Sequence, residues 1–317
     1  MATSTVSRSF TRPERVNKGT REHVLLVAER LGYAPNPAAR ALETGRSHTV
    51  ALLVPDITNP YFSGVIKGAE RAAHSAGLTL VLGDTQENPS LEAQMLGRLG
   101  PAVDGFVLSA SRLPDADLEA AARPVPVVLV NRAAPGLESV VSDFDSGTQQ
   151  IVDHLASLGH RSFVFLGGPA ESWSGARRWA GLRAAGRRRG LKARRLGPYL
   201  PTVSGGLAAA DAAVAAGADA TALVCHNDML AIGVLRRLAA RGVRVPEDVS
   251  VVGFDDIFTS ALISPSLTTL AERTEEAGRR AVETVRRHEL QRPADPMVQV
   301  LPTELRIRDS SGPAPVP

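Results

Sequence analysis

Several features that would identify other classes of protein are scarce in this sequence of 317 residues. It has one cysteine, Cys225, which excludes an intrachain disulfide framework and a cysteine-cluster metal site. We expect Cys225 to behave as a small buried apolar residue. No segment approaches the roughly 18 consecutive apolar residues of a membrane helix, and the N-terminal residues are polar and basic where a secretory signal would be apolar. We therefore expect a soluble, cytoplasmic protein with no membrane partner.

The common catalytic signatures are also absent. The first predicted strand is not followed by G-x-G-x-x-G, and the chain has no G-x-x-x-x-G-K-[ST], no H-E-x-x-H and no G-x-S-x-G. No histidine or hydroxyl nucleophile is plainly placed beside a base. We expect no enzyme activity, no metal and no cofactor. A sugar-processing enzyme stays an alternative, which turnover of a bound ligand would revive.

Charge is unevenly distributed along the chain. Residues 1–46 hold eight Lys or Arg against four Glu, a net charge of +4, whereas the whole chain has +3. A basic head on a nearly neutral body is typical of a nucleic-acid reader, although a solvated arm would have the same charge. A second basic run, "RRRGLKARR" at 187–195, precedes Gly197 and Pro198 and is predicted to be a solvated helix end.

Short β-branched runs alternate with helical patterns from residue 49 onward, which predicts a mainly parallel sheet with crossover helices. The predicted strands are 49–55, 78–84, 104–110, 125–131, 161–168, 221–228 and 249–256. The predicted helices include 62–76, 90–99, 146–158, 176–189 and 229–241. Two sets of these units, roughly 48–146 and 147–268, indicate two α/β lobes. The apolar content of 44% is sufficient for more than one core.

Polar residues follow several of these strands, where ligands of parallel α/β sheets bind. They are Asp56, Asn59, Asn131, Asn227, Asp228, Asp255 and Asp256. A set of Asn and Asp residues suits hydrogen bonding to a polyhydroxylated molecule better than bond breaking. Asn227 could instead cap the helix at 229, with Asp228 the better candidate for that cap.

A short helical pattern, "YAPNPAARALETGRS", occupies residues 33–47 between the basic head and the first strand. Asn36 can accept a first-turn N–H and Pro37 is preset for the first helical position, but the pattern ends at Gly45. A helix this short is not stable alone in water.

An ordered set of motifs runs along almost the whole chain. It comprises "STVSR" (4–8), "TREHVLLVAERLGYAPNPAARAL" (20–42), "VALLVPDITNPYFSGVIKGAE" (50–70), "DGFVLS" (104–109), "GHRSFVFLGGP" (159–169), "RRWAGLRAA" (177–185), "HNDMLAIGVL" (226–235), "VPEDVSVVGFDD" (245–256) and "SPSLTTL" (264–270). In order and spacing it resembles the lactose-repressor (LacI/GalR) family of transcriptional regulators, from residue 1 to about 310.

The resemblance implies a two-lobed α/β body like type I periplasmic binding proteins, preceded by a small all-α helix-turn-helix head and a hinge helix. Residues 1–46 would form the head and hinge, and residues 47–317 the effector-binding and dimerisation domain. The N-lobe would contain about 48–146 and 271–297, and the C-lobe about 147–268 and 299–309.

DNA contacts follow from the same resemblance. Residues 3–10 would form the recognition helix, and residues 18–31 a supporting helix with Asn17 as its cap, one apolar face of Val24, Ala28 and Leu31, and Gly32 as its stop. Residues 36–44 would form the hinge helix, in which Leu42 enters the minor groove and kinks the duplex. The predicted DNA-binding residues are Thr3, Ser4, Thr5, Ser7, Arg8, Asn36, Ala39, Arg40 and Leu42.

The head departs from the family because the first helix of the helix-turn-helix has no counterpart, so we expect partial disorder there. Either the start is placed downstream of the true one, or this is a truncated regulator with impaired operator binding. A DNA-incompetent sensor is therefore an alternative. A solute-binding protein would share both lobes, but it should have a signal peptide and lack residues 1–46.

The effector site implied by the family lies between the lobes. Its predicted residues are Asn59, Tyr61, Phe62, Asn131, Arg177, Arg178, Asn227 and Asp255. We expect a homodimer that binds a palindromic double-stranded DNA operator and represses transcription. A small molecule, which we expect to be a carbohydrate, would close the cleft and change the spacing of the two hinges. Whether closure releases or tightens DNA is left open.

Overall fold

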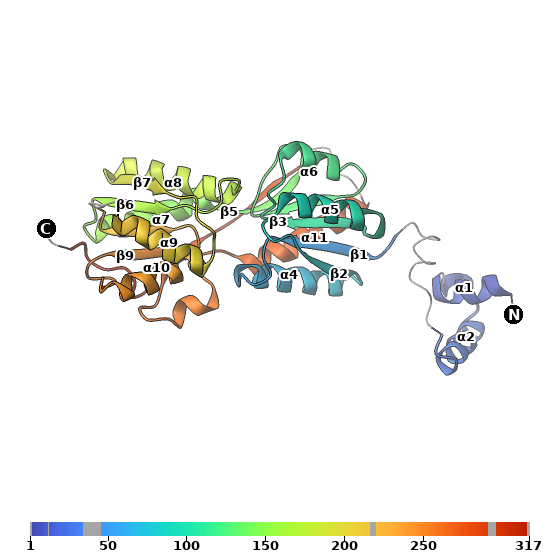
Figure 1. Cartoon of the computed structure of the whole chain (residues 1–317). Coiled ribbons are helices and arrows are strands. Elements are labelled where there is room, and N and C mark those ends of the chain that lie inside the picture. The colour runs from blue at the N-terminus through green and yellow to red at the C-terminus, as the bar shows by residue number, and fades with distance from the viewer. Residues whose placement is uncertain (1, 12, 34–45, 216–219, 291–295, 316–317) are drawn as a thin grey trace.

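A small helical head and two α/β lobes lie in a row in the computed structural model, which describes residues 2–11, 13–33, 46–215, 220–290 and 296–315 (Figure 1). The predicted fold class is confirmed, because each lobe contains a mainly parallel sheet with helices on both faces. The predicted hinge helix, with Asn36, Ala39, Arg40 and Leu42, lies outside the described residues. Its assignment stays a prediction.

The first lobe is built on a six-stranded parallel sheet in the order β11-β5-β4-β3-β1-β2. In that order its strands are Val298–Leu301, Glu138–Ser142, Val127–Val130, Gly105–Ser109, Thr49–Val54 and Thr79–Asp84. Its helices are α4 (Tyr61–Ser75), α5 (Pro89–Leu99), α6 (Asp115–Ala121) and α11 (Thr274–Leu290), with the 3-10 turn η2 (Gly100–Ala102) after α5.

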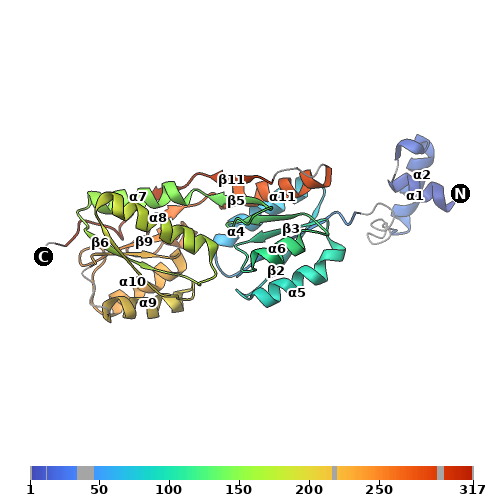
Figure 2. The same cartoon turned by 90° about the horizontal axis from the view of Figure 1, so that it is seen from above.

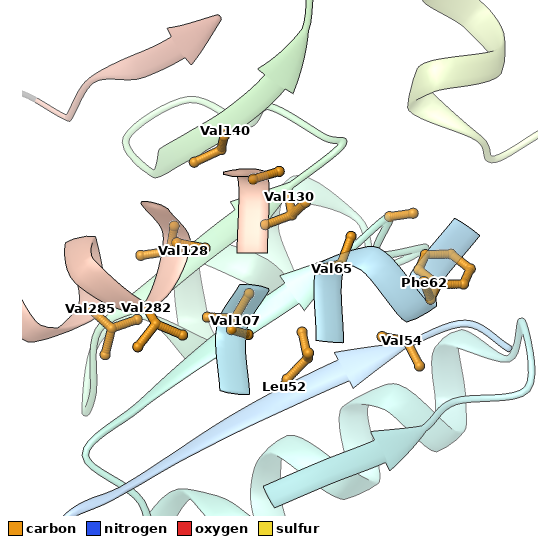
Figure 3. Packing of buried hydrophobic residues seen from close by; sticks show 14 of the residues in the cluster. Leu52, Val54, Phe62, Val65, Val107, Val128, Val130, Val140, Val282 and Val285 are labelled. Carbon is orange, nitrogen blue, oxygen red and sulfur yellow. The ribbon is translucent and has the colours of Figure 1, made fainter. Parts of the chain in front are cut away.

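The period-2 alternation of strand side chains divides this lobe into two cores. On β1, Leu52 and Val54 point toward α4 and α11, whereas Leu53 points toward α5 and α6. Figure 3 shows Leu52, Val107 and Val128, from three neighbouring strands, meeting the helix side chains of the first core. Both faces of the sheet are buried, which is why its strands are continuous apolar runs.

The second lobe repeats this arrangement with strand order β12-β10-β9-β8-β6-β7. In that order its strands are Glu304–Arg306, Thr268–Ala271, Ser250–Asp255, Ala222–Cys225, Ser162–Leu166 and Lys192–Leu196, and β12 alone is antiparallel to its neighbour. Helices α7 (Phe144–Ser157) and α8 (Trp173–Arg189) cover one face, and α9 (Val203–Ala215) and α10 (Asp228–Ala240) the other. The 3-10 turn η3 (Phe258–Ala261) follows β9.

Three chain segments, here called the crossovers, pass between the lobes: β5 to α7, β10 to α11 and β11 to β12 (Figure 2). Each crossover leaves the carboxyl end of a strand. Because parallel strands end at the same edge of a sheet, the carboxyl edges of both sheets face each other. The polar residues that follow those strands are thereby brought to the boundary between the lobes.

The head consists of α1 (Thr3–Thr11), the 3-10 turn η1 (Pro13–Arg15) and α2 (Lys18–Arg30). The predicted cap is confirmed, because the Asn17 side chain accepts a hydrogen bond from the Gly19 N–H at 3.0 Å, and Gly32 has the left-handed φ of 61° expected after a helix end. Of the predicted apolar face, Val24 and Ala28 are buried, whereas Leu31 is 76% exposed. Leu31 is the C-cap residue, and no described element covers it.

Two sequence predictions of secondary structure need correction. The basic run 187–195 is only partly a helix end: α8 stops at Arg189, Gly190 adopts φ 71°, and the edge strand β7 begins at Lys192. Charged side chains are common on edge strands, where they discourage pairing with other chains. The sequence analysis also missed four short strands besides β7: β5, β10, β11 and β12.

Helices α4 and α11 pack backbone against backbone through two glycines. A Cβ on Gly278 would lie 2.0 Å from the Val65 carbonyl oxygen, and one on Gly68 would lie 1.8 Å from the Glu275 carbonyl oxygen. We expect Gly278→Ala to lower the free energy of unfolding by about 1–3 kcal/mol in urea denaturation, because the helices must separate. The matched control is Gly97→Ala in α5, where nothing lies within 4 Å and alanine should stabilise the helix by about 0.5–1 kcal/mol. Equal effects of the two substitutions would contradict this account of the packing.

Candidate functional site

A buried arginine lies at the centre of the boundary between the lobes. Arg178, on α8, has a side chain that is only 3% exposed. Its Nη2 donates to Glu272 Oε1 at 2.6 Å and to Asp255 Oδ1 at 3.2 Å, and its Nη1 donates to the His226 carbonyl oxygen at 2.5 Å. We call Arg178, Asp255, Glu272, Tyr61 and His226 the interlobe cluster.

Glu272 connects the two lobes through its two carboxylate oxygens. It directly follows β10 on a crossover, and its side chain is 1% exposed. While Oε1 accepts from Arg178 of the second lobe, Oε2 accepts from Ser142 Oγ at 2.6 Å and from the Tyr61 hydroxyl at 3.3 Å. Ser142 ends β5 and Tyr61 begins α4, so both belong to the first lobe.

Burial and charge shift the pKa values of three residues in the interlobe cluster. Burial, together with the negative charges of Glu272 and Asp228, raises the pKa of Asp255 well above its usual value, against the opposing effect of Arg178. Burial and the positive charge of Arg178 hold the pKa of His226 well below its usual value, so His226 is neutral. Burial opposes the charge of Arg178, but Glu272 and Asp255 raise its pKa and keep it a cation.

Aromatic rings cover the guanidinium of Arg178. Its Cζ lies 4.6 Å from the centroid of the Phe254 ring and 5.0 Å from that of Phe144. These contacts leave the edge of the guanidinium for hydrogen bonding.

Three of the predicted effector residues, Tyr61, Arg178 and Asp255, meet in this cluster. Asn59 lies two residues before α4, and its Oδ1 accepts a hydrogen bond from the Tyr61 N–H at 3.1 Å. Phe62 was expected to stack on a ligand, but its ring is 5% exposed and belongs to the core of the first lobe, where Figure 3 shows it near Val54.

The other predicted residues occupy separate places. Asn131 follows β4 with φ 56° and a buried side chain. Arg177 lies outside the interlobe cluster: its side chain is 49% exposed and pairs with Asp145 at 3.1 Å.

The helix-cap prediction for Asp228 was wrong. Asn227 is the cap of α10, since its Oδ1 accepts from the Leu230 N–H at 3.0 Å, and its Nδ2 donates to the Pro201 carbonyl oxygen. Asp228 points inward and accepts hydrogen bonds from Thr269 Oγ1, Ser260 Oγ and the Ile257 N–H. Burial raises the pKa of Asp228 to about 7.

Several buried polar atoms near the facing sheet edges have no hydrogen-bond partner in the described part of the chain. Among them are Ser109 Oγ, Asn131 Oδ1, Arg132 Nε, Arg178 Nε and His226 Nδ1. Buried polar groups are rarely left unsatisfied. A small polar ligand between the lobes would supply hydrogen-bond partners for such atoms on both lobes.

Sequence reasoning missed Glu272 and His226. Glu272 follows "TTLA", a strand of four residues that was not recognised, so its position at a strand end was not apparent. His226 stands in "CHND" directly after a recognised strand, beside Asn227 and Asp228, and the rule that found its neighbours would have found it too.

We also searched the described ranges for metal-binding groups and membrane-spanning helices. No group of three or more His, Cys, Asp or Glu residues there could hold a metal ion. No helix in the same ranges is long and apolar enough to cross a membrane.

Comparison with known proteins gives matches over nearly the whole chain. Residues 152–311 match the periplasmic binding protein-like domain family. The chain is 33% identical over 297 residues to the HTH-type transcriptional repressor CytR of Escherichia coli, covering 89% of this chain and 84% of that protein. Its structure is similar to the Lac repressor dimer bound to operator and the anti-inducer ONPF, with TM-score 0.87, 25% identity and coverage of 98% and 95%. It is also similar to a complex of the transcriptional regulator CelR with cellobiose, with TM-score 0.75, 28% identity and coverage of 98% and 96%.

We expect Arg178→Met to lower the free energy of unfolding by about 3–5 kcal/mol at pH 7, because it leaves buried carboxylates without their cation. The loss should be smaller at pH 5. Burial raises the pKa of Asp255, so at pH 5 this carboxylate takes up a proton more readily than an exposed one does. The variant then has one fewer buried negative charge without a partner. The neighbouring change Arg177→Met breaks only an exposed pair and should cost less than about 1 kcal/mol. Urea unfolding at both pH values measures this, and similar losses for the two variants would refute the role of Arg178.

Proposed function

Because this chain belongs to the lactose-repressor (LacI/GalR) family of transcriptional regulators, we propose that it represses transcription by binding a palindromic operator as a homodimer. The effector in this proposal is a small molecule, namely a sugar, which binds between the lobes and changes the affinity of the dimer for DNA. The relatives that support this are a transcriptional repressor, a repressor dimer on its operator and a regulator holding cellobiose.

The observation that carries the effector site is the interlobe cluster. It places one cation, two carboxylates and a tyrosine hydroxyl in contact across the boundary. His226 of the cluster and Asn131, which follows β4 of the first lobe, each offer an unpartnered polar atom. A ligand that bonds to both lobes favours one relative position of them, which is the requirement for an allosteric effector.

Coupling to DNA would run through the segment before the first lobe. We assign DNA contacts to the exposed residues Thr3, Ser4 and Arg8 of α1 and to Leu42 of the hinge. In a dimer, rotation of the first lobes would change the spacing of two such segments. The sign of the response depends on which spacing the closed cleft produces.

A DNA-incompetent ligand sensor is the second candidate, and one observation favours it. Within residues 2–33 several apolar side chains remain exposed: Leu26 at 48%, Val27 at 37%, Leu31 at 76% and Tyr33 at 55%. A head with so small a core is weakly stabilised.

Selection of the purified chain on a random-duplex pool at near-physiological salt, against non-specific competitor, tests the proposal. Enrichment of a palindrome with a flexible pyrimidine–purine step at its centre supports operator binding. Without enrichment, recovery on an in-frame upstream extension would place the defect in the head. If neither the chain nor its extended form enriches a duplex, the result favours the DNA-incompetent ligand sensor.

We expect Arg8→Ala to weaken binding to the selected duplex by about 1–3 kcal/mol, because Arg8 would lose a base or phosphate contact. Arg123→Ala is the control, because this exposed arginine pairs with Glu119 on α6, in the body of the protein. Electrophoretic mobility shifts over a range of salt concentrations measure both variants. Equal DNA affinity of Arg8→Ala and the wild type would contradict the assignment of Arg8 to the DNA interface.

Asp255→Ala should abolish binding of any carbohydrate that stabilises the wild-type chain, while the body remains folded. The reason is that Asp255 orients Arg178 and presents a carboxylate at the boundary. Calorimetry gives the affinity and circular dichroism checks the fold. An unchanged effector affinity would contradict the assignment.

A further inference from the structure

Three of the five N–H groups of Arg178 donate to the protein itself. Nη2 is shared by Glu272 and Asp255, Nη1 donates to the His226 carbonyl oxygen, and only Nε lacks a partner among the described residues. The forked face that an arginine offers to a phosphate or carboxylate is therefore occupied by internal carboxylates.

No net positive charge is left in the interlobe cluster. With both carboxylates ionised, one cation faces two anions. If burial keeps a proton on Asp255, Arg178 and Glu272 still neutralise each other. Burial also holds the pKa of His226 well below its usual value, so it adds no charge.

Two buried arginines near these sheet edges are paired with carboxylates. Arg112 pairs with Glu87 at 2.7 Å, and Arg132 pairs with Asp115 at 2.7 Å. Arg195, beside Gly167, is exposed to solvent. An anionic ligand that approached Arg112, Arg132 or Arg178 would meet the carboxylate paired with that arginine.

From this arrangement we infer that the effector is a molecule without negative charge that presents hydrogen-bond donors, and that Glu272 is the residue that excludes anionic analogues. The inference rests on the proposed effector site. It assigns Glu272 a role in specificity and favours a free sugar or nucleoside over its phosphate or acid. The unpartnered single atoms Asn131 Oδ1, Ser109 Oγ and His226 Nδ1 suit neutral hydroxyl and amine groups.

The first arm of the test compares compounds that share a skeleton and differ in charge. We would titrate the full chain by calorimetry with glucose and glucose 6-phosphate, with ribose and ribose 5-phosphate, and with adenosine and its 5′-monophosphate. The expected result is that any parent compound that binds does so at least 100-fold more tightly than its phosphate. A phosphate that binds as tightly as its parent would overturn the inference.

The second arm needs no knowledge of the effector, because its probe is inorganic phosphate. Glu272→Gln removes one negative charge from beside Arg178, so phosphate should bind at least tenfold more tightly than it binds the wild type. The matched control is Glu275→Gln, which makes the same chemical change three residues away, at a side chain that is 45% exposed and pairs with Lys67. Its phosphate affinity should equal that of the wild type.

Equal phosphate affinity in the wild type and Glu272→Gln, with circular dichroism confirming the fold, would overturn the role of Glu272. This arm can be read even if no sugar or nucleoside binds and no operator is selected. Failure of the proposed function is therefore distinguishable from failure of this inference.

Discussion

The ion pairing of Arg178 constrains much of this structure. A guanidinium that is almost fully buried is tolerated only where carboxylates and hydrogen-bond acceptors surround it, and here these come from Asp255 at the end of β9 and Glu272 on a crossover. Because Glu272 also accepts from Ser142 and Tyr61, satisfying this one cation ties the second lobe to the first. The position of the lobes and the chemistry of the boundary thus depend on the same contacts.

Under the proposed function, this arrangement would allow binding at the boundary to affect distant parts of the chain. The lobes have separate cores and are joined by three crossovers, so contacts at the facing edges of the sheets can bias their relative position without disturbing either core. In the first lobe, α4 and α11 approach so closely through Gly68 and Gly278 that they should move as one unit. Tyr61 begins α4, so a change at the cluster reaches the packed helix pair directly.

Sequence patterns predicted the long elements well and the short ones poorly. All seven predicted strands are present because runs such as "VALLV" bury both faces of a parallel strand. Strands β10 and β12 have four and three residues, and β7 carries three charges, so none has a distinctive pattern. The choice between Asn227 and Asp228 as cap failed because both residue types cap helices equally well. What decided it was the set of donors around Asp228, contributed by Ile257, Ser260 and Thr269, which no local pattern contains.

By itself the sequence determined the two-lobed α/β architecture, the membership of a regulator family and the presence of Arg178 and Asp255 at the boundary, because periodicity and ordered motifs are local properties. Tertiary structure alone decided which side chains complete the site. Tyr61, Arg178 and Glu272 are distant in the chain and meet only when three crossovers bring both sheet edges together. It likewise placed Phe62 in a core and Arg177 in solvent, since exposure depends on what packs around a residue. Burial and charge pairing arise from the folded arrangement, and the proposed preference for an uncharged effector rests on them.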